Sequence, residues 1–175
     1  MQKVKNFALI SLSLFLLWGS PVGAQTQQND DLYAQTRISV NGTPISIMLP
    51  DLFVFDETQS AYLYSGAAAS IQIQYLQGVS LEQAIKGIDQ SDMKGQGLEV
   101  VSREELKTAA GVSAYLVKTS LTAVASDPDK SVPYHRYIFV AGNAERTVYI
   151  LANYPQVTES VLADLLKSAL LSVEF

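Results

Sequence analysis

Cysteine is absent from the 175-residue sequence, and histidine occurs only once, as His135. Without cysteine the protein has no disulfide, no thiol nucleophile and no site for a lipid-modified cysteine. A single histidine with no cysteine is also a poor ligand set for zinc. These absences exclude disulfide-stabilised folds and cysteine chemistry.

Clusters of positive charge are missing as well. Twelve Lys and Arg residues stand against 17 Asp and Glu residues, which gives a net charge of −5, and the basic residues are scattered along the chain. Binding to nucleic acid or to an anionic membrane surface depends on a concentrated basic patch. The charge pattern therefore argues against both kinds of partner.

The first 24 residues have the three parts of a secretory signal peptide. Lys3 and Lys5 supply positive charge, "FALISLSLFLLW" is an apolar run, and small residues end at Ala24. The run is shorter than the roughly 20 residues of a membrane-spanning helix. We expect cleavage after Ala24 and a mature chain with neither a lipid anchor nor a transmembrane span. An uncleaved N-terminal anchor is the alternative.

Cleavage would leave an exported protein, periplasmic or extracellular, with ten basic and 17 acidic residues and a net charge of −7. Residues 25–36, "QTQQNDDLYAQT", are polar and aperiodic, which is typical of a disordered leader. Residues 37–175 contain no repeat and no long low-complexity stretch, and their length predicts a single domain.

Alternating apolar and polar residues predict a series of strands joined by tight turns. Residues 37–49 predict a hairpin turning at Asn41-Gly42, and residues 60–76 predict two strands joined at Ser65-Gly66. Ile71, Ile73 and Tyr75 share one face of the second of these strands. Four more strands are predicted at "LEVVSREEL", "SAYLVKTSLTA", "PYHRYIFVA" and "RTVYILANY", with turns at Gly111 and in "ASDPDKS".

Two segments have the period of an amphipathic helix instead. Ser80 and Gln83 form a capping box that opens the first, which we expect to end at Gly95 and Gly97. Pro155 opens the second. The apolar stripes comprise Leu81, Ala84, Ile85 and Ile88 in the first helix, and Val157, Val161, Leu162, Leu165, Leu166, Ala169 and Leu170 in the second. The predicted fold is therefore α+β, with a mainly antiparallel sheet packed against two principal helices.

Four stretches in this order resemble the PsbP-like superfamily, particularly its DcrB-like periplasmic members. They are "ISIMLP", "SLEQAIKGI", Gly111 followed by "SAYLVKT", and "LLKSALLSVEF", and the resemblance covers about residues 42–175. It implies a layered sandwich of the PsbP-like type and a small extracytoplasmic domain without a shared catalytic centre. Many DcrB-like proteins are lipoproteins, and this chain lacks the cysteine that such an anchor needs.

Candidate catalytic and metal-binding groups are sparse. A hydrolase using His135 would need a positioned serine and acid, and no G-x-S-x-G motif is present. Asp127 and Asp129 are conceivable calcium ligands, but "SDPDKS" is more typical of a turn. Glu104 and Glu105 are strand neighbours whose side chains diverge. We predict no catalytic residue, no metal site and no cofactor.

The hairpin around "VPYHRYIFVAGNAERTVYILANYP" has two chemically different faces. With a turn at Asn143-Ala144 or over residues 142–145, Phe139 pairs with Val148, Tyr137 with Ile150 and His135 with Ala152. This is the more apolar face, which the helices should cover, and His135 is then a partly buried strand residue. The opposite face carries Tyr134, Arg136, Ile138, Thr147, Tyr149, Leu151 and Asn153.

Four residues of that opposite face, Tyr134, Arg136, Tyr149 and Asn153, are the candidate binding residues. Tyrosine and arginine combine contact area with directed hydrogen-bond donors. The alternative is that the second helix covers them, with the Arg136 stem lying along the sheet. The function predicted from the sequence is a non-enzymatic binding or assembly module of the cell envelope, with another envelope protein or a small ligand as partner. A hydrolase using His135 and an extrinsic subunit of a membrane-associated complex are the alternatives.

Overall fold

The computed structural model describes residues 34–89, 91–123 and 131–175. Within these ranges the elements in chain order are β1 (Gln35–Ser39), β2 (Ser46–Pro50), β3 (Val54–Asp56), β4 (Ala61–Tyr64), β5 (Ala69–Gln77), α1 (Leu81–Asp89), β6 (Glu99–Lys107), β7 (Ser113–Ala123), β8 (Val132–Gly142), β9 (Arg146–Pro155) and α2 (Glu159–Leu171), with short 3₁₀ turns at Ser65–Ala67 and Gln156–Thr158.

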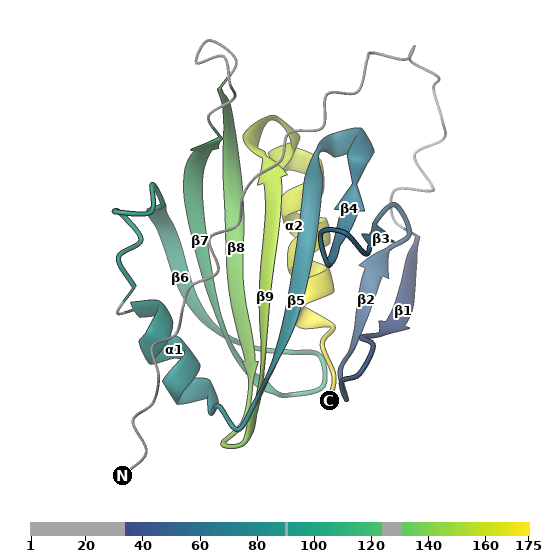
Figure 1. Cartoon of the computed structure of the whole chain (residues 1–175), viewed down its shortest axis with the longest axis vertical. Helices are drawn as coiled ribbons and strands as arrows, with labels where there is room; N and C mark the ends of the chain where they lie inside the picture. The colour runs from purple at the N-terminus through teal and green to yellow at the C-terminus, as the bar shows by residue number, and fades with distance from the viewer. Residues whose placement is uncertain (1–33, 90, 124–130) are drawn as a thin grey trace.

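The main sheet has seven antiparallel strands in the order β3-β4-β5-β9-β8-β7-β6, and β1 and β2 form a separate pair (Figure 1). The predicted α+β class, a mainly antiparallel sheet with two principal helices, is confirmed. None of the helices in the described ranges is long and apolar enough to cross a membrane.

The predicted N-terminal hairpin is present as β1 and β2, with Ile38 opposite Ile47. Gly42 lies in its turn with a φ of 74°, a conformation that glycine adopts without strain. β1 begins at Gln35, so the last two residues of the expected polar leader belong to a strand. The expected signal peptide and residues 25–33 lie outside the described residues.

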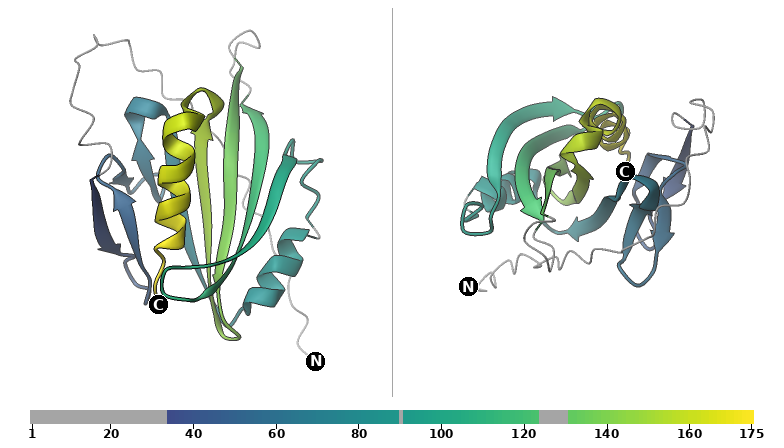
Figure 2. Two further views of the ribbon diagram at one scale, coloured as in Figure 1. Left: turned by 180° about the vertical axis from the view of Figure 1, so that it is seen from behind. Right: turned by 90° about the horizontal axis from the view of Figure 1, so that it is seen from above.

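The core on one face of the sheet lies between β5, β9, β8 and α2. Phe139 and Ile150 face each other across β8 and β9, and both are fully buried. The β1–β2 hairpin lies beside α2 (Figure 2), where the Met48 amide donates to Ser172 Oγ at 2.8 Å. The helix buries Leu162, Leu165, Leu166, Ala169 and Leu170 against this face. The hairpin face predicted to be the apolar one is therefore covered as expected.

The opposite face of the sheet is covered in part by α1, which differs from our expectation that both helices lie on the apolar face. Ala84 and Ile88 of α1 pack against Val117, Ile138 and Val140 in a second core cluster. The predicted capping box is confirmed, because the Gln83 amide donates to Ser80 Oγ and the Ser80 amide donates to Gln83 Oε1. One helix on each face follows from the sheet being apolar on both sides at its centre.

Both predicted helices differ from the structure at one end. α1 ends at Asp89 rather than near Gly95 and Gly97, and the Ser91 hydroxyl donates to the carbonyl of Ile88 at 2.6 Å. α2 begins only at Glu159, after a 3₁₀ turn. Val157 is consequently 87% exposed, and Val161 is also exposed, so these two residues are not part of the buried stripe.

The β8–β9 turn also differs from the prediction. Phe139 pairs with Ile150, Tyr137 with Ala152 and His135 with Tyr154, two residues away from the expected partners. Asn143 opens the turn instead of forming its centre, and its side-chain Oδ1 accepts from the amides of Glu145 and Arg146. A shift of two residues preserves the face of every side chain, so the predicted faces are correct although the partners are wrong.

Candidate functional site

The described structure contains an apolar groove beside α1, which we call the α1 groove. α1 is held at the end of the sheet that carries the β8–β9 turn, because the Leu81 amide donates to the carbonyl of Asn143 at 2.9 Å. The rest of this sheet face extends beyond the helix (Figure 1). The groove between them has a volume of about 330 Å³. It is lined by Ser60, Gln72, Ile73, Gln74, Leu76, Gln83, Ala84, Gly87, Ile88, Ser91, Met93, Gln96, Leu98, Ile138, Tyr149 and Leu151.

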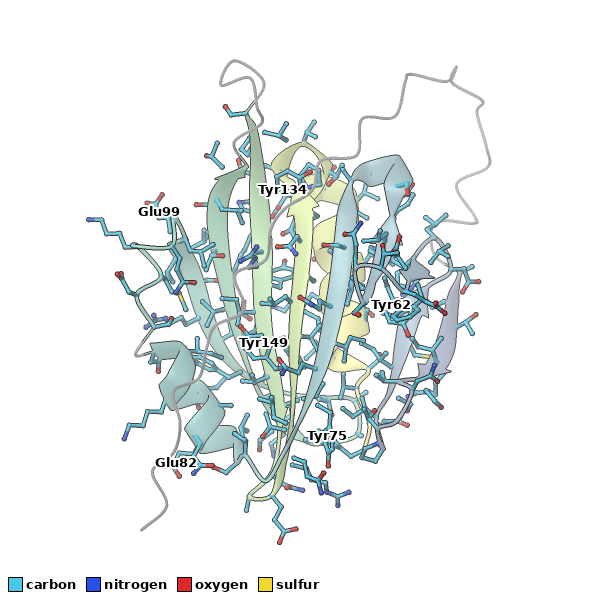
Figure 3. The ribbon with its side chains drawn as sticks, viewed as in Figure 1. Tyr62, Tyr75, Glu82, Glu99, Tyr134 and Tyr149 are labelled. Atoms are coloured by element: carbon cyan, nitrogen blue, oxygen red, sulfur yellow. The ribbon has the colours of Figure 1, made fainter. Side chains whose placement is uncertain are left out.

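The walls of the α1 groove are apolar and its remaining surface is neutral. Ile138 and Leu151 are cross-strand neighbours on β8 and β9, and Tyr149 lies on the same face (Figure 3). Amide groups of glutamines from β5, α1 and the following loop supply donors and acceptors. No charged side chain is present among the described residues that line the groove. An apolar cavity with a few polar groups is the usual form of a small-molecule site.

A polar row crosses the sheet next to this groove. Arg136, the residue two positions before Ile138 on β8, lies opposite Asn153 of β9, which in turn lies opposite Ser70 of β5. Arg136 Nε donates to Asn153 Oδ1 at 2.6 Å, and Asn153 Nδ2 donates to Ser70 Oγ at 3.1 Å. The side-chain amide of Asn153, itself bonded to Ser70, thus holds the guanidinium of Arg136 from one side, and both of these partners are uncharged.

The structure brings together three of the four residues predicted from the sequence. Arg136 and Tyr149 are half-buried and Asn153 is 2% exposed, so they do not form an exposed flat patch; Tyr149 lines the groove, and Arg136 and Asn153 form the next cross-strand pair on that face after Ile138 and Leu151. Burial lowers the pKa of Arg136 and raises the pKa of Tyr149. The charge of each side chain shifts the pKa of the other in the direction opposite to burial. Tyr134 is only 4% exposed, and burial raises its pKa. It pairs with Pro155 and Leu121 at the far end of this face.

The groove also contains residues that sequence reasoning missed. Gly87 comes from α1, and Met93, Gln96 and Leu98 come from the segment after it, where the predicted helix continues as far as Gly95 and Gly97 but α1 ends at Asp89. A β-carbon added at Gly87 would meet no atom within 4 Å. Glycine inside an amphipathic helix is unfavourable, and its presence was the one signal of an unfilled space.

A second cluster surrounds His135 on the other face of the sheet. Glu159, the first residue of α2, accepts from Lys118 Nζ at 2.5 Å through Oε1 and lies 2.5 Å from His135 Nδ1 through Oε2. The rings of His135 and Tyr154 meet edge to face, with centroids 5.7 Å apart. The buried Tyr154 hydroxyl has no hydrogen-bond partner among the described residues. His135 is a partly buried strand residue as predicted, and its cluster attaches the start of α2 to the sheet.

The pH dependence of stability should reflect this attachment. Burial raises the pKa of Glu159, but hydrogen bonds from Lys118 and His135 outweigh it and the net pKa is below its usual range. A carboxyl whose pKa is lower in the folded state adds stability at neutral pH and loses it in acid. We expect Glu159→Gln to be less stable than the parent at pH 7, by less than about 1 kcal/mol because Glu159 is partly exposed.

That difference should shrink as the pH falls through about 4 towards 3, where the carboxyl of the parent protein becomes protonated. Urea unfolding at a series of pH values measures it. Glu145→Gln, which removes the same charge from the exposed β8–β9 turn, is the control. Parallel stability curves for Glu159→Gln and the parent would contradict the assignment.

The other acidic candidates are placed as follows. Glu104 and Glu105 diverge as predicted, since Glu104 Oε2 accepts from Lys167 Nζ of α2 at 2.7 Å and Glu105 lies on the Tyr115 side. In residues 34–89, 91–123 and 131–175 no three His, Asp or Glu side chains are grouped to hold a metal ion. Asp127 and Asp129 lie outside the described residues.

Comparison with known proteins identifies the fold. No protein-family model matches the chain, and no curated protein is detectably similar in sequence. The Ran-binding protein Mog1p of Saccharomyces cerevisiae has 15% identity and a TM-score of 0.56, over 81% of this chain and 95% of Mog1p. The cyanobacterial PsbP (CyanoP) of Synechocystis has 10% identity and a TM-score of 0.53, over 89% and 99%.

LpqN, which is involved in cell envelope biogenesis of Mycobacterium tuberculosis, has 13% identity and a TM-score of 0.50, over 80% of this chain and 89% of LpqN. Similarity at these identities concerns the fold alone. The chain has the PsbP-like fold, as the resemblance in its sequence implied. The narrower DcrB-like assignment stays a prediction.

Proposed function

We propose that this protein is an exported, non-enzymatic binding module of the cell envelope that holds a small, mostly apolar ligand in the α1 groove. The observation that carries the proposal is the groove itself, whose volume of about 330 Å³ lies within the range of ligand pockets. Its walls expose apolar surface that water covers at a cost and that a ligand would cover favourably.

Two further observations support the proposal. The N-terminal segment has the composition of a secretory signal peptide, which favours export. Among proteins of similar fold, LpqN is involved in cell envelope biogenesis and Mog1p binds Ran, so this fold serves binding roles elsewhere. Fold alone does not transfer a function, and the groove is the feature specific to this chain.

A hydrolase using His135 is the alternative that a specific observation favours. Glu159 contacts His135 Nδ1, and Ser120 lies opposite His135 across β7 and β8. A serine triad requires a hydrogen bond between the serine hydroxyl and the other ring nitrogen. Among the described residues the only side-chain hydrogen bond of His135 is the one to Glu159, which Lys118 shares. We therefore place binding first.

The proposal is tested by filling the groove. Gly87→Leu places a side chain into open space at the groove. It should weaken binding of the uncharged dye Nile red by about tenfold or more, because the leucine side chain and the dye compete for one cavity. The same change should raise the free energy of unfolding by about 0.5–1 kcal/mol, because glycine is unfavourable inside a helix. Dye fluorescence and urea unfolding measure the two effects.

The matched control is Lys86→Leu, which adds leucine to an exposed position of the same helix outside the groove lining. It should leave dye affinity unchanged. A parent protein that does not bind Nile red, or a Gly87→Leu variant that binds it as the parent does, would refute the α1 groove as the ligand site.

A further inference from the structure

Arg136 is the charged residue on the sheet face that floors the α1 groove, next to the lining residue Ile138. It shares its sheet face with Ile138, the following residue on that face of β8, and with Tyr149, whose pKa it affects and which lines the groove. Because Ile138 lines the cavity and Arg136 is the preceding residue on the same face of β8, the guanidinium lies beside the cavity. α1 begins beside the β8–β9 turn, and the positive charge lies at the opposite end of the groove.

The guanidinium is held in place but is not neutralised by the described residues. Its Nε donates to the amide of Asn153, and no hydrogen bond of either Nη nitrogen is present within the described ranges. The ion pairs in the same ranges use Arg37, Arg103, Lys118, His135 and Lys167, and none uses Arg136. The Nη donors thus remain free for a ligand, in the fork geometry that matches a carboxylate or phosphate.

Partial burial makes this charge costly unless an anion accompanies it. Arginine stays protonated in proteins, so a half-buried guanidinium without a counter-ion loses hydration and gains little in return. An anion held by the Nη groups would offset that loss through charge-assisted hydrogen bonds. The row from Arg136 through Asn153 to Ser70 keeps the fork in position before any ligand arrives.

Resting on the function proposed above, we infer that the α1 groove binds a single-chain amphiphile with an anionic head, its apolar chain between α1 and the sheet and its carboxylate or phosphate on Arg136. The uncharged lining suits the chain, and the glutamine amides suit neutral polar groups near the head. Arg136 at one end gives the ligand a direction in the groove.

The first test needs only the parent protein. Displacement of Nile red is measured with monomeric dodecanoate, dodecyl phosphate, dodecanol and dodecyltrimethylammonium at one ionic strength. We expect the two anions to bind about tenfold or more tightly than the alcohol, the size of effect that charge-assisted hydrogen bonds produce, and the cation to bind more weakly than the alcohol. Equal affinity for dodecanoate and dodecanol would overturn the inference while leaving the proposed function intact.

The second test removes the charge. Arg136→Gln should lose most of its affinity for dodecanoate and dodecyl phosphate, about tenfold or more, and keep its affinity for dodecanol. Retained binding of dodecanol shows that the variant is folded with an intact groove. Arg146→Gln, which removes the same charge from the exposed first residue of β9, is the control and should change neither affinity. Unchanged dodecanoate binding by Arg136→Gln would overturn the inference.

Arg136→Lys keeps the charge without the planar fork, and should have a dodecanoate affinity between those of the parent and Arg136→Gln. This variant also covers the case in which Arg136→Gln does not fold. Acetate and inorganic phosphate, the heads without a chain, should not displace the dye. Failure of the two anions to displace bound dye would overturn the inference, whereas a parent protein that does not bind the dye at all would refute the proposed function itself. Sedimentation with anionic vesicles in the absence of displacement by dodecanoate would identify a membrane surface and overturn the inference.

Discussion

Replacing Phe139 by alanine is expected to lower the free energy of unfolding by about 3–5 kcal/mol. Phe139 is fully buried between the sheet and α2, and Ile150 faces it across the β8–β9 pair. Truncation removes the apolar area of the ring and leaves a cavity at the centre of the larger core cluster, which rigid neighbouring strands do not fill. Urea unfolding followed by circular dichroism measures the loss.

Phe55→Ala is the matched control because it removes the same ring from the edge strand β3, where Phe55 is 48% exposed. It loses the contact with Tyr62, 5.1 Å between ring centroids, from a half-exposed position and should cost at most about 1 kcal/mol. Similar losses for the two variants would show that the central hairpin is not the core of the domain.

Gly142→Ala is expected to destabilise the protein by about 1–3 kcal/mol, because the new methyl group has no space. A β-carbon at Gly142 would contact the carbonyl oxygen of Arg146 and lie 2.8 Å from Cα of Thr147. These are backbone atoms of the paired strand and cannot rotate away. The strands must separate at the point where Thr147 Oγ1 donates to the carbonyl of Val79, next to the start of α1.

Because this end of the hairpin also anchors α1 through Leu81 and Asn143, Gly142→Ala should weaken Nile red binding together with stability. Gly87→Ala provides the control: it makes the same chemical change in open space and should stabilise the protein by about 0.5–1 kcal/mol. Urea unfolding curves of Gly142→Ala and Gly87→Ala measure the two changes in stability. A Gly142→Ala variant as stable as the parent would mean that the hairpin end adjusts freely.

The strands and their faces were predictable from the sequence because the signal for them is local. Alternation along "PYHRYIFVA" and "RTVYILANY" places Phe139 and Ile150 on one face and Arg136 and Tyr149 on the other, whatever the turn. The register was not predictable in the same way. A shift of two residues preserves the faces, so only the Asn143 side chain and the fit of the turn separate the correct pairing from its neighbour.

The candidate site was likewise predictable from the sequence only in part. The sequence indicated that Arg136, Tyr149 and Asn153 share a face, and the hydrogen bond between Arg136 and Asn153 depends on the register that the sequence did not reveal. The groove was beyond sequence reasoning altogether. Its lining joins residues of β5, α1, β8 and β9, and its space exists because α1 stops at Asp89 and begins beside the β8–β9 turn.

By itself the sequence determined the fold class, the absence of cysteine chemistry, the amphipathic helices and the two faces of the central hairpin. All of these follow from composition or from the periods of 2 and 3.6 residues, which are properties of short segments. Tertiary packing decided which helix covers which face, the partners across β8 and β9, and the open space beside α1. These depend on contacts between segments distant in the chain, whose energies compete only once the whole sheet has assembled.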